Sequence, residues 1–410
     1  MKKYVIIGNG TAAIGCIEGI RSVDPDGSVT VLSRENHHVY SRPLISYYLE
    51  GKTDPERMKY RSADFYEKMK CDVLYGQSAA KIDPKGKTIL TDGGAGIPYD
   101  ALCVATGSSP FLPPMKGLET VDKKFNFMTL DDALALQAAV TGKTRVLIVG
   151  AGLIGLKCAE GLHGLVGSIT VCDLADRVLS SILDADCAAI VQEHLEKQNI
   201  EFLLSDSVER FDGCTAHMQS GATVEFDVLV LAVGVRAETS LIRDLGGDVG
   251  RGIVVDERMA TSLPDIYAAG DCTEGEDISS GTRRVLAILP NAYMQGHTAG
   301  VNMAGGAAAL TNAVPMNSIG FFGLHMMTAG SYEGEMIEES AEGAIKRFFV
   351  KDGVLKGFIL IGQTERAGIY TSLIRDCTPI DTIDAELAKK SAAYSIFSAE
   401  IRRKTLGGVV

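Results

Sequence analysis

Two glycine-rich turns hold the residues of this chain that are best suited to bind a phosphate group. The first begins Gly8-Asn9-Gly10 and the second begins Gly150-Ala151-Gly152. In such a turn one glycine permits the tight bend, and the next lets backbone approach a pyrophosphate. A small third residue lets the following helix pack closely, with its first amides facing the anion. The residues expected to hold the phosphates are Gly8, Gly10, Thr11, Ala12 and Ala13 in the first copy and Gly150, Gly152, Leu153, Ile154 and Gly155 in the second.

The strands and helices expected on either side of these turns are repeated as well. An apolar run consistent with a buried parallel strand precedes each turn, and a helix-like segment follows it. Residues 28–31 match residues 168–171 as the second strand, and residues 100–107 match residues 227–234. Three matched blocks in the same order predict two nucleotide-binding domains built on βαβ units.

A third motif, Thr261 to Asp271, reads as a turn, a short strand and a glycine followed by a carboxylate. With this motif and the two turns, the chain resembles the FAD-dependent pyridine nucleotide-disulfide oxidoreductase superfamily over roughly residues 1–310. Residues 40–46, 150–157 and 289–296 are most similar to one branch of it. That branch contains the NADH:rubredoxin reductases and the flavin module of assimilatory nitrite reductase.

The resemblance implies an α/β fold with two Rossmann-like nucleotide-binding domains, the NAD domain being inserted in the FAD domain, and a small α+β C-terminal interface domain. The expected boundaries are 1–113 and 240–316 for the FAD-binding domain, 114–239 for the NAD(P)H-binding domain and 317–410 for the interface domain. In the last of these, two strand-like runs flank Lys351-Asp352-Gly353, which is a hairpin signal. Residues 365–376 and 384–404 are expected to be helical.

Several FAD ligands are implied by the resemblance. Asp271 is expected to hydrogen-bond the ribityl chain. The helix that begins near Asn291 should point its positive end at the flavin N1–C2=O edge, where negative charge collects on reduction. Glu35 is the expected ligand of the adenosine ribose, unless it is a solvent-facing glutamate, and Arg42 should lie near the cofactor's polar backbone, unless it is a surface arginine. The other expected FAD contacts are Pro43, Ala105, Thr106, Gly107, Gly270 and Ala292.

The second turn is expected to bind NAD because of Asp173. An acid at the end of the second strand usually binds a ribose hydroxyl, and its charge repels a 2′-phosphate, so Asp173 favours NADH over NADPH. The alternative is a capping acid on the next helix, and Arg177 could offset the preference. Gly234 is a further expected NAD contact. Lys157 is only a candidate nicotinamide contact, because many superfamily members have a glutamate at this position.

The composition and the cysteines narrow the remaining chemistry. The 410 residues carry a formal net charge of −12, which argues against nonspecific nucleic-acid binding. No apolar run is long enough to span a membrane, and we expect a cytoplasmic protein. The nine cysteines form no CxxC or CxxxxC pair, so no local metal, iron–sulfur or dithiol site is expected. Thiol chemistry is not expected either, because residues 42–48, the stretch that holds redox cysteines in the superfamily's disulfide reductases, contain none.

The expected activity is passage of a hydride from NADH to FAD, with no side chain acting as the catalytic group. By the resemblance, the electrons pass between NADH and an iron–sulfur electron-carrier protein or a partner redox subunit. The interface domain would dock that partner or form a homodimer. Two alternatives stay open: an NADH oxidase or diaphorase that uses dioxygen or a small acceptor, and a nucleotide-binding redox sensor or scaffold.

Overall fold

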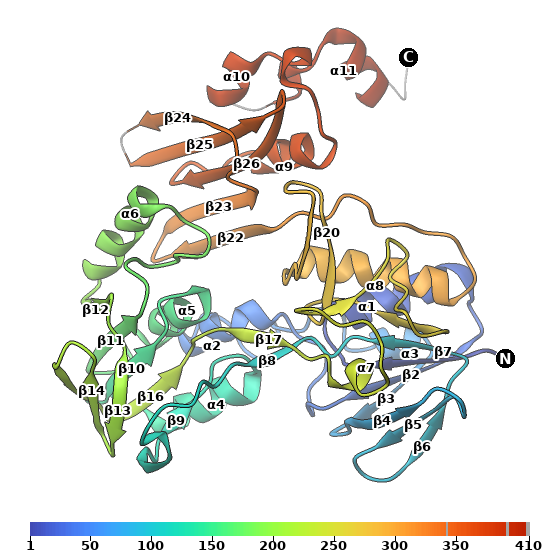
Figure 1. Ribbon diagram of the computed structural model, residues 1–410, viewed down its shortest axis with the longest axis horizontal. Coiled ribbons are helices and arrows are strands. Elements are labelled where there is room, and N and C mark those ends of the chain that lie inside the picture. Colours follow the sequence, from blue (N-terminus) through green and yellow to red (C-terminus); the bar gives the residue numbers. More distant parts are fainter. Residues whose placement is uncertain (342, 391–392, 407–410) are drawn as a thin grey trace. The chain divides into compact units, whose positions relative to one another are not determined.

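The computed structural model describes residues 1–341, 343–390 and 393–406, which form two compact units (Figure 1). The first unit contains residues 1–32, 77–107 and those from 239 onward, and the second contains residues 33–76 and 108–238. Each unit holds one of the glycine-rich turns and a parallel sheet, so the predicted α/β class is confirmed. The domain boundaries expected from the sequence stay a prediction.

A parallel sheet underlies the first turn. Its strands include, in spatial order, β19 (Ile266–Ala268), β7 (Ala101–Val104), β1 (Lys3–Ile7) and β2 (Ser28–Ser33). All three neighbouring pairs are parallel. Buried apolar residues predominate in these strands, as expected where helices cover both faces of a sheet, and β7 is buried along its whole length.

Two helices of this unit pack through glycines. They are α1 (Thr11–Val23) and α8 (Leu289–Met303). A Cβ at Gly15 would collide with the Tyr293 carbonyl oxygen, and a Cβ at Gly296 would collide with the Ala12 carbonyl oxygen. The two backbones therefore touch, and α8 lies against the helix that follows the first turn.

Short elements complete the nucleotide-binding part of the first unit. They are β4 (Ala79–Asp83), β5 (Thr88–Thr91), β6 (Gly96–Pro98), α7 (Ser240–Arg243), β18 (Ile253–Val254), β20 (Thr273–Asp277) and β21 (Thr282–Arg284). Strands β4, β5 and β6 form one small sheet, and β18, β20 and β21 form another.

The C-terminal part of this unit is an antiparallel sheet with short helices. The strands, in spatial order, are β22 (Met316–Phe321), β23 (Leu324–Gly330), β26 (Val354–Ile361), β25 (Ala344–Lys351) and β24 (Glu335–Ala341). The predicted hairpin is confirmed, since β25 and β26 pair antiparallel across Asp352 and Gly353. Helix α9 (Ala367–Arg375) packs Tyr370 against Phe348 and Phe358.

The prediction that residues 384–404 form a single helix is wrong. From residue 384 onward the described residues form α10 (Ala385–Lys390), a 3-10 turn at Tyr394–Ile396 and α11 (Ala399–Leu406). Ile396 is buried in the same apolar core as Tyr370, and its carbonyl accepts the Asp384 amide at 2.8 Å. Burial of this isoleucine therefore turns the chain back instead of extending the helix.

The second unit repeats the parallel design. Its sheet runs β12 (Ile200–Leu204), β11 (Ser168–Asp173), β10 (Arg145–Val149), β16 (Val228–Leu231) and β9 (Lys124–Phe125), with all neighbours parallel. Its helices are α2 (Ile45–Leu49), α3 (Phe65–Lys68), α4 (Leu130–Ala139), α5 (Leu153–Leu162) and α6 (Ala185–Glu196). The remaining strands are β3 (Cys71–Tyr75), β8 (Ser108–Pro110), β13 (Val208–Asp212), β14 (Thr215–Met218), β15 (Thr223–Glu225) and β17 (Val235–Ala237). None of the helices in the described ranges is long and apolar enough to cross a membrane.

Candidate dinucleotide-binding sites

The first glycine of each turn has a conformation and a close approach that require glycine. Gly8 has φ +114° and Gly150 has φ +117°. A Cβ at Gly8 would collide with the Ala105 carbonyl oxygen, and a Cβ at Gly150 would collide with the Ala232 carbonyl oxygen. Each turn is therefore pressed against the end of the neighbouring parallel strand, β7 in the first unit and β16 in the second.

The second glycine of each turn borders open space. A Cβ at Gly10 or Gly152 would meet no atom within 4 Å. These glycines are the N-caps of α1 and α5, and within the described ranges no side chain caps the first amides of either helix. Uncapped helical N–H groups beside an open position are the arrangement that binds a pyrophosphate.

The small third residue packs each helix onto its sheet. A Cβ at Gly155 would collide with the Gly150 carbonyl oxygen, and Ala13 is fully buried at the matching place in α1. Thr11 and Ala12 are buried as well. Leu153 and Ile154, the first residues of α5, are half-buried. Both turns thus have a small or buried residue where the helix meets the sheet. The binding of a pyrophosphate by these residues stays a prediction.

The loops after β7 and β16 lie beside the turns. The position of a Cβ on Gly8 is also 3.4 Å from the Thr106 amide nitrogen. Gly107 and Gly234 have φ values of +68° and +113°, and a Cβ on either would meet nothing within 4 Å. The structure therefore brings residues 105–107 to the first turn, and Gly234 holds the matching place after β16.

Predicted FAD residues from distant parts of the chain meet in the first unit. The Cβ position of Gly270 lies 2.9 Å from the Ala12 Cβ and 3.7 Å from the Ala292 Cβ, and Asp271 follows directly. The Gly270 amide donates to Gln295 Oε1 at 2.8 Å. Gln295 is buried and was not among the predicted site residues. The signal for it was its place on α8 one turn after the predicted ligand Asn291.

Asn291 presents a buried acceptor to this site. It lies in the first turn of α8 and is 0% exposed. Its Nδ2 donates to the Val314 carbonyl at 2.9 Å, whereas its Oδ1 has no hydrogen-bond partner in the part of the chain that the structure describes. Leaving such an acceptor unsatisfied costs about 1–3 kcal/mol. A flavin ring N–H or a ribityl hydroxyl would supply the donor, so these residues fit FAD.

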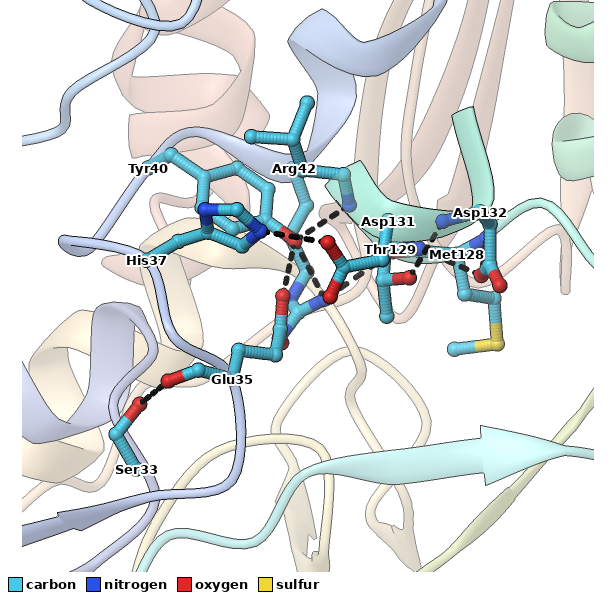
Figure 2. A network of polar contacts seen from close by, with 10 residues as sticks. Ser33, Glu35, His37, Tyr40, Arg42, Met128, Thr129, Asp131 and Asp132 are labelled. Atoms are coloured by element: carbon cyan, nitrogen blue, oxygen red, sulfur yellow. Dashed lines mark hydrogen bonds and ion pairs between the residues drawn. The ribbon is translucent and has the colours of Figure 1, made fainter. Parts of the chain in front are cut away.

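Glu35 and Arg42 lie together in a polar network (Figure 2). Arg42 Nη2 is paired with Glu35 Oε1, and the Tyr40 hydroxyl donates to Glu35 Oε2 at 2.6 Å. The Glu35 side chain is 16% exposed and that of Arg42 is 43% exposed. Glu35 is therefore engaged rather than solvent-facing, with Arg42 as its immediate partner, and Pro43 follows as an exposed residue.

Asp173 ends β11 and holds the second turn. Its Oδ2 accepts the Ala151 amide at 2.7 Å, and its Oδ1 accepts the Ala175 amide at 2.8 Å. The next helix, α6, is capped by Asp184 instead. A carboxylate has about four lone-pair positions, and these two bonds use two of them. The predicted role of Asp173 as a ribose ligand stays a prediction.

Lys157 is held within the second unit. Its ammonium is paired with Glu160, one turn further along α5, and lies 4.7 Å from the centroid of the Tyr47 ring. The Lys157 side chain is 18% exposed and that of Glu160 is 6% exposed. The positive charge that replaces the superfamily's glutamate is therefore compensated locally.

The thiols of the chain are poorly suited to catalysis. Burial raises the pKa of Cys172 to about 12 and that of Cys272 to about 11, so both stay protonated near neutral pH. Cys214 and Cys377 are exposed, and neither lies in residues 42–48. Over the described ranges there is no group of three or more His, Cys, Asp or Glu side chains that could hold a metal ion.

Comparison with known proteins agrees with this geometry. A family described as pyridine nucleotide-disulphide oxidoreductase matches residues 2–296. The chain is 32% identical over 396 residues to the NADH-dependent phenylglyoxylate dehydrogenase subunit epsilon of Aromatoleum evansii, covering 92% of this chain and 93% of that protein. It is 33% identical over 370 residues to the NAD(P)H nitrite reductase of Bacillus subtilis (strain 168), covering 88% of this chain but 44% of that protein.

A solved structure shares the fold. A chain of the covalent putidaredoxin reductase–putidaredoxin complex matches with a TM-score of 0.87 at 21% identity, over 95% of this chain and 99% of that chain. Sequence resemblance, turn geometry and family match agree. The chain belongs to the pyridine nucleotide-disulphide oxidoreductase family and is an FAD- and NAD(H)-binding oxidoreductase.

Proposed function

We propose that this chain transfers electrons between NADH and an iron–sulfur carrier protein or partner redox subunit. The observation that carries the proposal is the pair of matched turns, each with an uncapped helix N-terminus beside an open glycine position. Two dinucleotides held by one chain suit a hydride step between them. When bound, FAD supplies the chemistry, since it accepts two electrons as a hydride and can release them singly.

The residues of the chain bind and orient the two dinucleotides. Gly10 and Gly152 would leave room for the pyrophosphates. Asp173 and Glu35 would each accept hydrogen bonds from the hydroxyls of an adenosine ribose. Asn291 accepts from the cofactor at the start of α8, where the helix dipole favours negative charge. Each of these groups is a binding group rather than an acid, a base or a nucleophile.

Named relatives support a protein as the electron partner. One relative is called a subunit of an NADH-dependent dehydrogenase, and the matched solved chain is a reductase joined covalently to putidaredoxin. We assign the C-terminal sheet, β22 to β26, to contact with the partner or with a second copy of the chain.

The cysteines of the chain are free, which suits a reducing compartment, so we place the protein in the cytoplasm.

The test compares acceptors for electrons from NADH. The FAD-loaded protein is mixed anaerobically with NADH and either a rubredoxin or a 2[4Fe–4S] ferredoxin, and dioxygen consumption is measured separately. We expect at least one carrier to be reduced faster than dioxygen is consumed. Rapid turnover with dioxygen and no reduction of either carrier would contradict the proposal and indicate an NADH oxidase.

A further inference from the structure

The buried hydroxyl of Tyr40 joins the expected ribose ligand to a helix of the second unit (Figure 2). Tyr40 is 8% exposed, and burial raises its pKa well above the ordinary value, so the hydroxyl keeps its proton. The proton is donated to Glu35 Oε2 at 2.6 Å. The oxygen accepts the Leu130 amide at 2.8 Å and Arg42 Nη1 at 3.2 Å. The one donor and both lone pairs of the hydroxyl are therefore in use.

These contacts fix the carboxylate of Glu35. Tyr40 holds one oxygen and Arg42 holds the other. Two of about four lone-pair positions are used in this way, and the remaining two are left for the 2′ and 3′ hydroxyls of a ribose. Because Arg42 is 43% exposed and Tyr40 is buried, the tyrosine is the more rigid of the two supports.

The other end of the contact is the start of α4. Thr129 and Asp132 form a capping box there, which satisfies the amides of Asp132 and Thr129. The Leu130 amide, the first of the helix, is satisfied by Tyr40 instead. His37 Nε2 also pairs with Asp131 Oδ1 at 2.7 Å. The segment that carries Glu35 is thus anchored to a capped helix terminus.

We propose that Tyr40 is a positioning residue for the adenosine ribose of FAD. It acts through Glu35, holding one carboxylate oxygen from the α4 side and leaving the free lone pairs available to the ribose. The inference rests on the assignment of Glu35 to that ribose. It adds a second role for the start of α4, which then supports the FAD-binding carboxylate as well as its own helix.

The test measures the affinities of the apo-protein for FAD, ADP and FMN, with NAD+ present at saturation so that the Asp173 site is filled and ADP reports on the Glu35 site. Tyr40→Phe should lower the affinities for FAD and ADP by about tenfold, which corresponds to about 1.4 kcal/mol of binding free energy. FMN lacks the adenosine, so its affinity should not change. Since all three probes bind only folded protein, a loss of stability would lower all three affinities by the same factor. The ratio of the ADP affinity to the FMN affinity therefore isolates the positioning effect.

Two further variants make the outcome decisive. Tyr48→Phe is the matched control, because the Tyr48 hydroxyl donates to Gln137 Oε1 of the same helix at 2.9 Å, and we expect it to leave the ratio unchanged. Glu35→Gln should weaken FAD and ADP, and Tyr40→Phe should add nothing in that background.

The two assignments fail in different ways. If Glu35→Gln leaves FAD affinity unchanged, the ribose assignment itself is wrong. If Glu35→Gln lowers the affinity for FAD but Tyr40→Phe does not, only the positioning role is overturned. The same holds if Tyr40→Phe lowers the affinity for FMN as much as that for FAD.

Discussion

At the scale of single residues, we propose that the charge of Asp173 sets the choice of coenzyme. Two backbone amides fix its carboxylate, that of Ala151 in the second turn and that of Ala175 just after β11, so the orientation of the carboxylate is set before a coenzyme binds. Arg177 is a cation that could attract a 2′-phosphate, but it is paired with Asp176 at 2.7 Å and donates to the Leu183 carbonyl at 3.3 Å. The local charge therefore disfavours NADPH.

The coenzyme prediction follows from this geometry. NADH should exceed NADPH by at least about tenfold in kcat/KM, since an unmatched charged contact is worth on the order of 1.5–3 kcal/mol. Asp173→Ala should narrow the gap in steady-state assays with both coenzymes. Glu193→Ala is the control, because Glu193 pairs with Lys197 on the exposed side of α6 and should leave the ratio unchanged. Equal use of both coenzymes by the unmutated protein would show that the assignment is wrong.

At the scale of elements, two glycines at the start of α5 have different roles, one in ligand binding and one in packing. A Cβ at Gly152 would point into open space, whereas a Cβ at Gly155 would strike the Gly150 carbonyl oxygen. We propose that the first position is small to leave room for the ligand, whereas the second must be small because the helix touches the turn at Gly150. The two glycines therefore make different predictions although they lie three residues apart.

Gly152→Ala should fold normally and bind NADH more weakly, while Gly155→Ala should lower the free energy of unfolding by about 1–3 kcal/mol through overpacking. Thermal unfolding and NADH titration of each variant check this. Gly142→Ala is the control, because its Cβ would also meet nothing within 4 Å but lies outside the turn. Unchanged NADH affinity in Gly152→Ala would contradict the placement of the pyrophosphate.

The sequence predicts those elements whose signals are local. The apolar strands, both glycine turns and the hairpin at Asp352 follow from short patterns, and the structure contains them. The glycine contact between α1 and α8 joins residues about 280 positions apart, and the Tyr40 bond to Leu130 spans 90 positions. Such pairings depend on which surfaces meet after folding, so periodicity does not reveal them. The split of residues 384–404 has the same cause, because burial of Ile396 depends on the sheet beneath it.

At the scale of the whole molecule, the buried thiols should make the free energy of unfolding fall at alkaline pH. Burial raises the pKa of Cys272 from 9.0 to about 11. The folded protein therefore holds a proton that the unfolded chain loses above about pH 9. The stabilisation is complete below that pH and is lost as the pH rises towards 11. Cys172, with its pKa raised to about 12, acts in the same direction.

The free energy of unfolding should fall by on the order of 1 kcal/mol for Cys272 alone between pH 8 and pH 10. Denaturant unfolding across this range measures the slope. Cys272→Ala should flatten it, even if it lowers stability at every pH. Cys214→Ser is the control and should leave the slope unchanged, because Cys214 is exposed. A slope that is the same in all three proteins would contradict the assigned role of the buried thiol.

The central claim for the molecule is that its two dinucleotide sites work together in one hydride step. Anaerobic stopped-flow mixing of NADH with the FAD-loaded protein tests it most directly, through the flavin absorbance. We expect the absorbance of oxidised flavin to bleach well within a second. A flavin that stays oxidised for minutes at saturating NADH would contradict the claim and leave a protein that only holds its nucleotides.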